Sequence, residues 1–113
     1  MEKILNINIE YINLEKKYCI DYLDSEGEMI SISLPLNEWN KNVIVSYLIR
    51  SKYSQDTMEA IVNNHFLNIA EWIDKKISGS TESFIDPEYD EMQRWRKVCK
   101  KLADEALQQY PEN

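Results

Sequence analysis

The first 35 residues alternate between apolar and polar side chains in three separate runs. In the first run, Leu5, Ile7, Ile9 and Tyr11 alternate with Asn6, Asn8 and Glu10. A period of two places the two sets on opposite faces of a β-strand. After a loop at residues 13–16 the alternation recurs at residues 18–22 and 30–34, and the Asp-Ser-Glu-Gly segment at 24–27 supplies turn residues. The pattern predicts a three-stranded antiparallel meander whose apolar face needs a cover.

Residues 54–77 form the longest stretch with helical periodicity. The mostly apolar members of its stripe recur at spacings of three and four, which places them on one side of a helix. They are Met58, Ile61, Val62, His65, Phe66, Ile69, Trp72, Ile73 and Ile77. Ser54 is a suitable N-cap, and Gly79 follows the last turn, where a left-handed residue ends a helix. The stripe is wide, and we expect this helix to help cover the sheet.

Residues 37–51 fit either a helix or a strand. Asn37 is placed to cap a helix running to about Ser51, in which Trp39, Val43 and Tyr47 repeat every four residues. Residues 43–49 are rich in β-branched and aromatic side chains, so a fourth strand after a turn at residues 40–42 is the alternative. We favour the helix, which would be apolar nearly all round and lie between the sheet and the helix of residues 54–77.

Residues 87–109 predict a third helix. Asp86 offers an N-cap acceptor, Pro87 suits the first helical position, and Pro111 ends the helix. Its apolar side consists of Tyr89, Met92, Trp95, Cys99, Leu102, Ala103, Ala106 and Tyr110. Together these elements predict a single α+β domain over residues 1–113, with an N-terminal three-stranded antiparallel meander (1–35) packed against three α-helices (36–113).

The composition is typical of a soluble globular protein. The chain has 113 residues, of which 43% are hydrophobic and 29% charged, so it can form a core without disulfides or metals. No apolar run reaches the ~20 residues of a membrane-spanning helix, so we expect no membrane contact. Cys19 and Cys99 are far apart and match no disulfide framework or zinc spacing. We interpret both as packing residues in a reducing cytoplasm.

The net charge of −7 argues against a general nucleic-acid coat, because phosphate binding requires clustered Lys and Arg. One basic run occurs in the last predicted helix, where Arg94, Lys97 and Lys101 share a face. We interpret this face as solvated, with contact to a protein partner's acids or to nucleic acid as the alternatives. Asp90 lies four residues before Arg94 and can form a local ion pair with it.

Common catalytic and metal-binding motifs do not occur in the sequence. Two glycines cannot form a phosphate-binding loop or a dinucleotide fingerprint, and there is no nucleophile elbow, Cys-x-x-Cys or His-Glu-x-x-His. His65, the one histidine, lies inside an apolar stripe, and Asn64 and Asn68 are expected to point elsewhere. We interpret it as a core or boundary residue with a structural hydrogen bond, because catalysis or metal binding would need acidic or cysteine partners nearby. We expect no catalytic residue, metal or cofactor.

Segments of the C-terminal half resemble small uncharacterised reading frames of bacteriophages and prophages. They are Tyr53-Ser54-Gln55, residues 59–64 (Glu-Ala-Ile-Val-Asn-Asn), Glu88-Tyr89 and residues 93–97 (Gln-Arg-Trp-Arg-Lys). The resemblance is a pattern of helix surface and core residues without a chemical motif. It implies that a mobile element encodes the protein, and it assigns no catalytic residue.

These observations favour a small non-enzymatic protein–protein interaction module, because the sequence provides surface rather than a cluster of reactive groups. Leu67, Leu107 and Tyr110 fall at or beyond the margins of their apolar stripes, so they are candidates for an exposed patch that forms a homodimer. The basic face of the last helix is the candidate for contact with a partner's acids. The alternatives are an acidic inhibitor or DNA mimic acting on a basic host partner, and a local nucleic-acid contact through that basic face.

Overall fold

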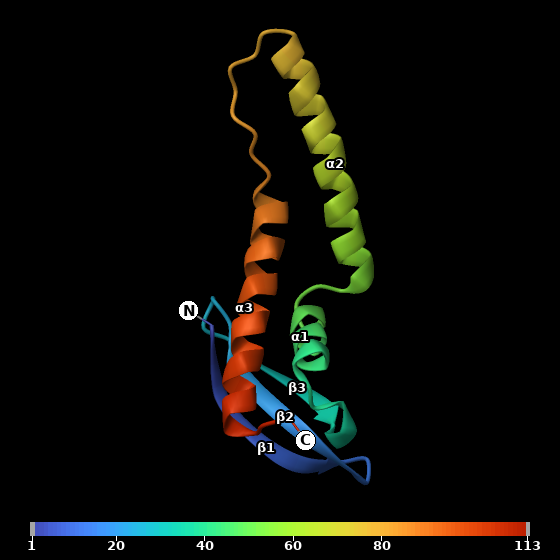
Figure 1. Cartoon of the computed structure of the whole chain (residues 1–113), viewed down its shortest axis with the longest axis vertical. Helices are drawn as coiled ribbons and strands as arrows, with labels where there is room; N and C mark the ends of the chain where they lie inside the picture. The colour runs from blue at the N-terminus through green and yellow to red at the C-terminus, as the bar shows by residue number, and fades with distance from the viewer. Residues whose placement is uncertain (1, 113) are drawn as a thin grey trace.

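The computed structural model describes residues 2–112, and in that range three β-strands are followed by three α-helices (Figure 1). The elements are β1 (Lys3–Ile12), β2 (Glu15–Leu23), β3 (Met29–Pro35), α1 (Lys41–Arg50), α2 (Gln55–Ile77) and α3 (Pro87–Gln109), with a 3-10 turn, η1, at Leu36–Glu38. The strands form one antiparallel sheet in the order β1-β2-β3. The predicted α+β class is confirmed.

Tight turns join the strands. The β1–β2 connection is shorter than expected, because only Asn13 and Leu14 lie outside the strands, both with left-handed φ angles of 51° and 67°. Positive φ at both central residues is typical of the type I′ turn, whose twist suits a two-residue hairpin. In the second turn, the Asp24 carboxylate accepts hydrogen bonds from the Glu26 and Glu28 amides, and Gly27 has a φ of +82°.

The apolar face of the sheet forms the core together with α1 and α3. Ile7, Ile20 and Ile32 are register partners across the three strands, and Tyr18 pairs with Leu34 beside them. Burial on this face is greatest along the central strand β2. The expected alternation of β1 is wrong at its start, where a register shift between Ile4 and Asn6 leaves Leu5 45% exposed.

Residues 43–49 are helical, as favoured, and the alternative of a fourth strand is excluded. The predicted cap is wrong, however. Asn37 lies in η1, and Asn40 caps α1 by accepting a hydrogen bond from the Val43 amide at 3.1 Å. Trp39 precedes the helix because its indole is fixed elsewhere, stacked on Tyr18 with ring centroids 4.1 Å apart.

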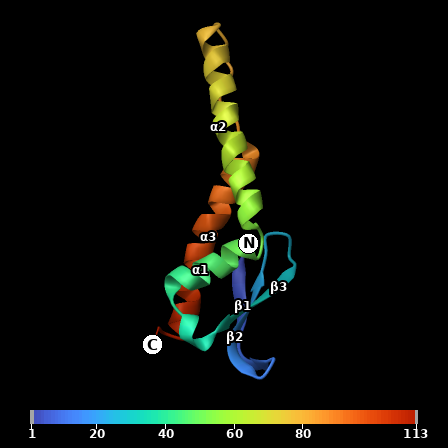
Figure 2. The same cartoon turned by 90° about the vertical axis from the view of Figure 1, so that its right-hand side faces the viewer.

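The placement of α2 differs from the expectation that it would help cover the sheet. Among residues 2–112, its main contacts are with α3, and α2 rises away from the strands (Figures 1 and 2). Three strands spaced about 4.8 Å apart form a sheet roughly 15 Å wide. Packed helices lie 8–10 Å apart, so α1 and α3 already fill that width. The described chain is therefore elongated, with extents of 61 × 25 × 24 Å.

The predicted bounds of α2 and α3 are confirmed by their caps. Ser54 accepts a hydrogen bond from the Thr57 amide at 3.1 Å, and Gly79 takes a φ of +96° just after α2. Asp86 caps α3 and Pro87 occupies its first turn. The buried side of α3 consists of Met92, Trp95, Cys99, Leu102, Ala103 and Ala106. The part of α3 that extends beyond the sheet is the platform on which α2 packs.

Candidate functional site on helix α2

One face of α2 presents a row of apolar side chains that the rest of the described chain covers only in part. The row, here called the α2 row, consists of Val62, Phe66, Ile69, Ile73 and Ile77. Phe66 is 64% exposed, Ile73 45% and Ile77 80%, whereas Val62 and Ile69 are half-buried. Spacings of four, three, four and four residues keep these side chains on one side of the helix.

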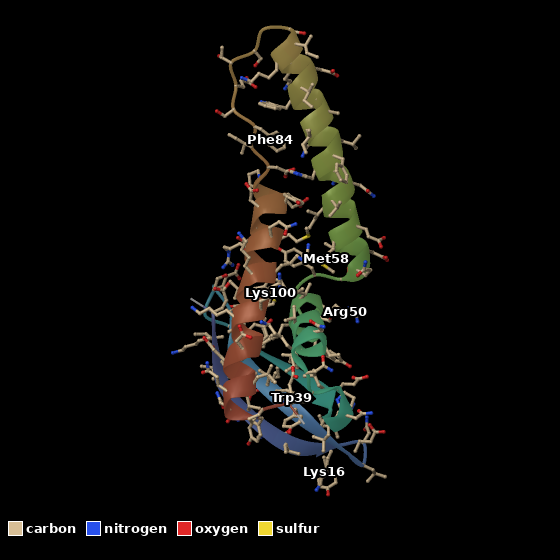
Figure 3. The ribbon with its side chains drawn as sticks, viewed as in Figure 1. Lys16, Trp39, Arg50, Met58, Phe84 and Lys100 are labelled. Atoms are coloured by element: carbon tan, nitrogen blue, oxygen red, sulfur yellow. The ribbon has the colours of Figure 1, made fainter. Side chains whose placement is uncertain are left out.

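The adjacent side of α2 is packed. Ile61 is buried and Met58 half-buried, and Figure 3 shows Met58 in the space between α2 and α3. Farther along, the segment 78–86 returns beside α2. There the Trp72 indole N–H donates a hydrogen bond to the Glu82 carbonyl at 2.9 Å, and the ring centroids of Trp72 and Phe84 lie 5.7 Å apart. The single wide stripe predicted from the sequence is therefore two stripes, one packed and one exposed.

A polar cluster, here called the His65 latch, joins the middle of α2 to the start of α3. His65 Nδ1 lies 2.8 Å from Asp86 Oδ2, and Asn68 Nδ2 donates to the same oxygen at 3.2 Å. The imidazole also stacks on Tyr89, with ring centroids 3.5 Å apart and planes 7° from parallel. An ionised carboxylate only accepts hydrogen bonds, so Nδ1 carries the hydrogen in this pair.

His65 is a half-buried boundary residue with a hydrogen bond, as expected, but its acidic partner Asp86 was not expected. Asp86 is 7% exposed, and its other oxygen accepts from the Tyr89 amide at 3.4 Å. The hydrogen bond from His65 is the main cause that lowers the pKa of Asp86, and those from Asn68 and the Tyr89 amide act in the same direction against the effect of burial. The expectation that Asn68 points elsewhere is wrong, because the latch brings its amide to Asp86.

A hollow of about 470 Å³ opens where α1, α2 and α3 meet. Its apolar lining comes from Ile49, Met58, Val62 and Met92, and its cationic lining from Arg50 and Arg96. Arg50 and Met58 mark this junction in Figure 3. The two guanidinium groups form no ion pair with any residue in the range 2–112. Because Val62 belongs to both features, the hollow continues the α2 row toward the sheet. The sequence pattern did not predict this hollow.

The predicted basic face of α3 is partly neutralised. Arg94 binds Glu91 at 2.8 Å and Glu2 at 2.7 Å, rather than Asp90 as expected. The Glu2 side chain is only 5% exposed, so this pair fastens the N-terminal segment to α3. Lys97 and Lys101 are exposed. The Arg94 guanidinium is therefore paired within the chain. Of the three basic residues predicted to contact a partner, Lys97 and Lys101 remain available at the surface.

The predicted apolar patch is not brought together. Leu67 is 63% exposed on α2, but it lies beside the α2 row rather than in it. Leu107 and Tyr110 pack against the core near the sheet, where the Tyr110 carbonyl accepts a hydrogen bond from the Trp39 indole. These residues therefore sit at different ends of the elongated chain. Exposed apolar side chains occur on α2 and also on the sheet, at Tyr11, Leu14 and Met29.

Within residues 2–112, no three His, Cys, Asp or Glu side chains gather in a way that could hold a metal ion. None of the helices described there is long and apolar enough to cross a membrane. Comparisons of the chain with protein-family models, with curated proteins and with solved structures each find no match.

Proposed function

We propose that this protein is a small non-enzymatic interaction module that binds a protein partner through the α2 row. The observation that carries the proposal is the exposure of Phe66, Ile73 and Ile77 along one line of a 23-residue helix. Single exposed apolar residues are ordinary on protein surfaces, whereas a contiguous apolar surface is typical of an interaction site. Amphipathic helices bind partners through apolar anchors at this spacing.

The chain holds the α2 row in a fixed position. The His65 latch joins the middle of α2 to α3, and the Trp72 hydrogen bond fixes its outer part to the returning segment. Ser54 caps the start of α2, and Gly79, with its left-handed backbone, follows the end of the helix. A surface that is already ordered loses less conformational entropy on binding, so these contacts support a role in recognition.

The α2 row has better structural support than the other two hypotheses. Nucleic-acid contact through the basic face of α3 loses one of its cations, because Arg94 is paired with Glu2 and Glu91. An acidic inhibitor or DNA mimic is motivated mainly by the net charge of −7. A mimic would bind a basic partner with a strong dependence on salt, whereas binding through the apolar α2 row should change little with salt.

Photo-crosslinking from α2 in cells tests this proposal. A benzoylphenylalanine placed at position 66 should form a discrete crosslinked product, because the α2 row faces the partner. The same group at position 67 is the matched control, since Phe66 and Leu67 are neighbours that are 64% and 63% exposed but point in different directions. Equal products from both positions, or none from position 66, would contradict the proposed function.

A further inference from the structure

The α2 row has the spacing of a two-helix seam. With Glu59 and Lys76 added at its ends, the positions along the helix are 59, 62, 66, 69, 73 and 76, which alternate between steps of three and four. This is the heptad spacing at which two helices wind around each other. The seam from Glu59 to Lys76 is roughly 26 Å long at 1.5 Å per residue. Ile77, the last member of the row, lies at its margin.

The spacing is the same when the helix is read in the opposite direction. In an antiparallel pair of α2 helices, Val62 of one copy therefore faces Ile73 of the other, and Phe66 faces Ile69. Glu59 faces Lys76 at both ends of the seam. An interface with two-fold symmetry must be self-complementary in this way, so each of these residue pairs occurs twice.

We propose that the partner of the α2 row is a second copy of this chain, bound antiparallel with the two-fold axis between Leu67 and Asn68. The inference rests on the proposed function, because it names the occupant of the same surface. The antiparallel dimer would be elongated, with the two sheets at opposite ends. Its interface differs from the patch of Leu67, Leu107 and Tyr110 that the sequence predicted for a homodimer.

The end charges select the antiparallel direction. Glu59 and Lys76 are both exposed, and neither forms an ion pair within residues 2–112. A parallel pair would place Glu59 against Glu59 and Lys76 against Lys76, and like charges in contact oppose association. The antiparallel pair converts both repulsions into attractions. The same side chains thus favour one arrangement and oppose the other.

The hollow at the helix junction is placed to receive the end of the second helix. In this register Ile77 of the second copy lies at the axial level of Met58 and on the side of the seam occupied by Asn63, and both residues line the hollow. Ile77 is 80% exposed in the single chain, so docking there removes a large apolar surface from water.

Sedimentation equilibrium of the purified full chain, combined with charge reversal, tests the inference. At about 100 µM, a dimer with a micromolar Kd is mostly assembled, so the wild type should sediment as a dimer. Glu59→Lys or Lys76→Glu should weaken the dimer by about 10- to 30-fold, because each change places like charges at both ends. The double variant Glu59→Lys/Lys76→Glu should recover the wild-type Kd. Parallel pairing keeps like charges facing each other in the wild type and in every variant, so it predicts that neither single change weakens the dimer by this factor.

Cysteine pairing gives an independent test of direction. In an oxidised mixture of Val62→Cys and Ile73→Cys chains, the antiparallel register predicts a disulfide joining the two different variants. A disulfide joining two copies of the same variant would contradict the register. A wild-type monomer at about 100 µM would overturn self-association. In that case, a position-66 crosslink to a different protein in cells would leave the proposed function standing, and loss of the crosslink would remove both.

Discussion

Replacing isoleucine by alanine at two positions separates the folding core from the α2 row. Ile44 lies in α1 and is fully buried, whereas Ile73 lies in α2 and is 45% exposed. The change removes three carbons, and at about 0.8 kcal/mol for each buried CH₂ their full burial is worth about 2.4 kcal/mol. At Ile44 the residual cavity adds to this cost, so we expect a loss of about 3–4 kcal/mol in the free energy of unfolding.

At Ile73 the same change should divide between folding and association. The part of the side chain already buried in the single chain is worth about 1.3 kcal/mol, and the exposed 45% is worth about 1.1 kcal/mol once a second copy covers it. Two copies lose about 2 kcal/mol together, which corresponds to a dimer roughly 40-fold weaker. Ile73→Ala should therefore affect assembly strongly and the stability of the dilute chain modestly.

Two assays measure the two effects on the same pair of variants. Urea unfolding of dilute protein gives the stability of the single chain, and sedimentation equilibrium at higher concentration gives the dimer Kd. If Ile73→Ala destabilised the dilute chain as much as Ile44→Ala does, the α2 row would belong to the folding core. If the Kd stayed unchanged, Ile73 would lie outside the interface. Either result would refute the reasoning.

Three further predictions concern the single chain. Hydrogen bonds from Arg94 lower the pKa of Glu2 and of Glu91. These carboxylates therefore stabilise the fold at pH values above their ordinary pKa of 4.5. This stabilisation is lost as the pH falls through their lowered pKa values. Arg94→Met should therefore cost about 1–2 kcal/mol in urea unfolding at pH 7 and less at pH 2.5, and an equal loss at both would contradict the ion-pair explanation. Leu14 is 96% exposed and has a left-handed φ of 67°. Leu14→Gly should therefore raise the free energy of unfolding by about 0.5–1 kcal/mol, because glycine adopts this φ without strain. An unchanged or lower Tm in thermal unfolding would oppose this explanation of the turn. Burial raises the pKa of Cys99 to about 12. Its thiol should therefore react with a disulfide reagent at pH 8 only when the chain unfolds. Rapid labelling of Cys99 in the native protein, identified by mass spectrometry, would be the contrary result.

Local signals were enough to predict α2 and α3. Ser54 and the Asp86-Pro87 pair act through neighbouring backbone amides and φ angles, so their effect is visible in a few residues of sequence. The start of α1 was predicted wrongly, because Asn37 was expected to be the cap. Asn40 caps the observed helix, and Trp39 before it is fixed by contacts with Tyr18 and with the Tyr110 carbonyl, which lies 71 residues farther along the chain.

The site itself was harder to predict, because periodicity shows which residues share a face and not what covers that face. Val62, Phe66 and Ile73 have the pattern of a core stripe, yet α1 and α3 leave no room for α2 on a three-stranded sheet. The His65 latch was missed for a related reason. Its acid, Asp86, is 21 residues away and reaches His65 only because segment 78–86 returns beside α2.

The most direct test of the interface is the oligomeric state of two neighbouring variants, Phe66→Asp and Leu67→Asp. The two side chains are equally exposed in the single chain, so a charge at either position should leave the fold intact, which circular dichroism can verify. The account predicts that Phe66→Asp sediments as a monomer at a concentration where the wild type and Leu67→Asp are dimers. A Phe66→Asp variant that dimerises as well as the wild type would contradict it.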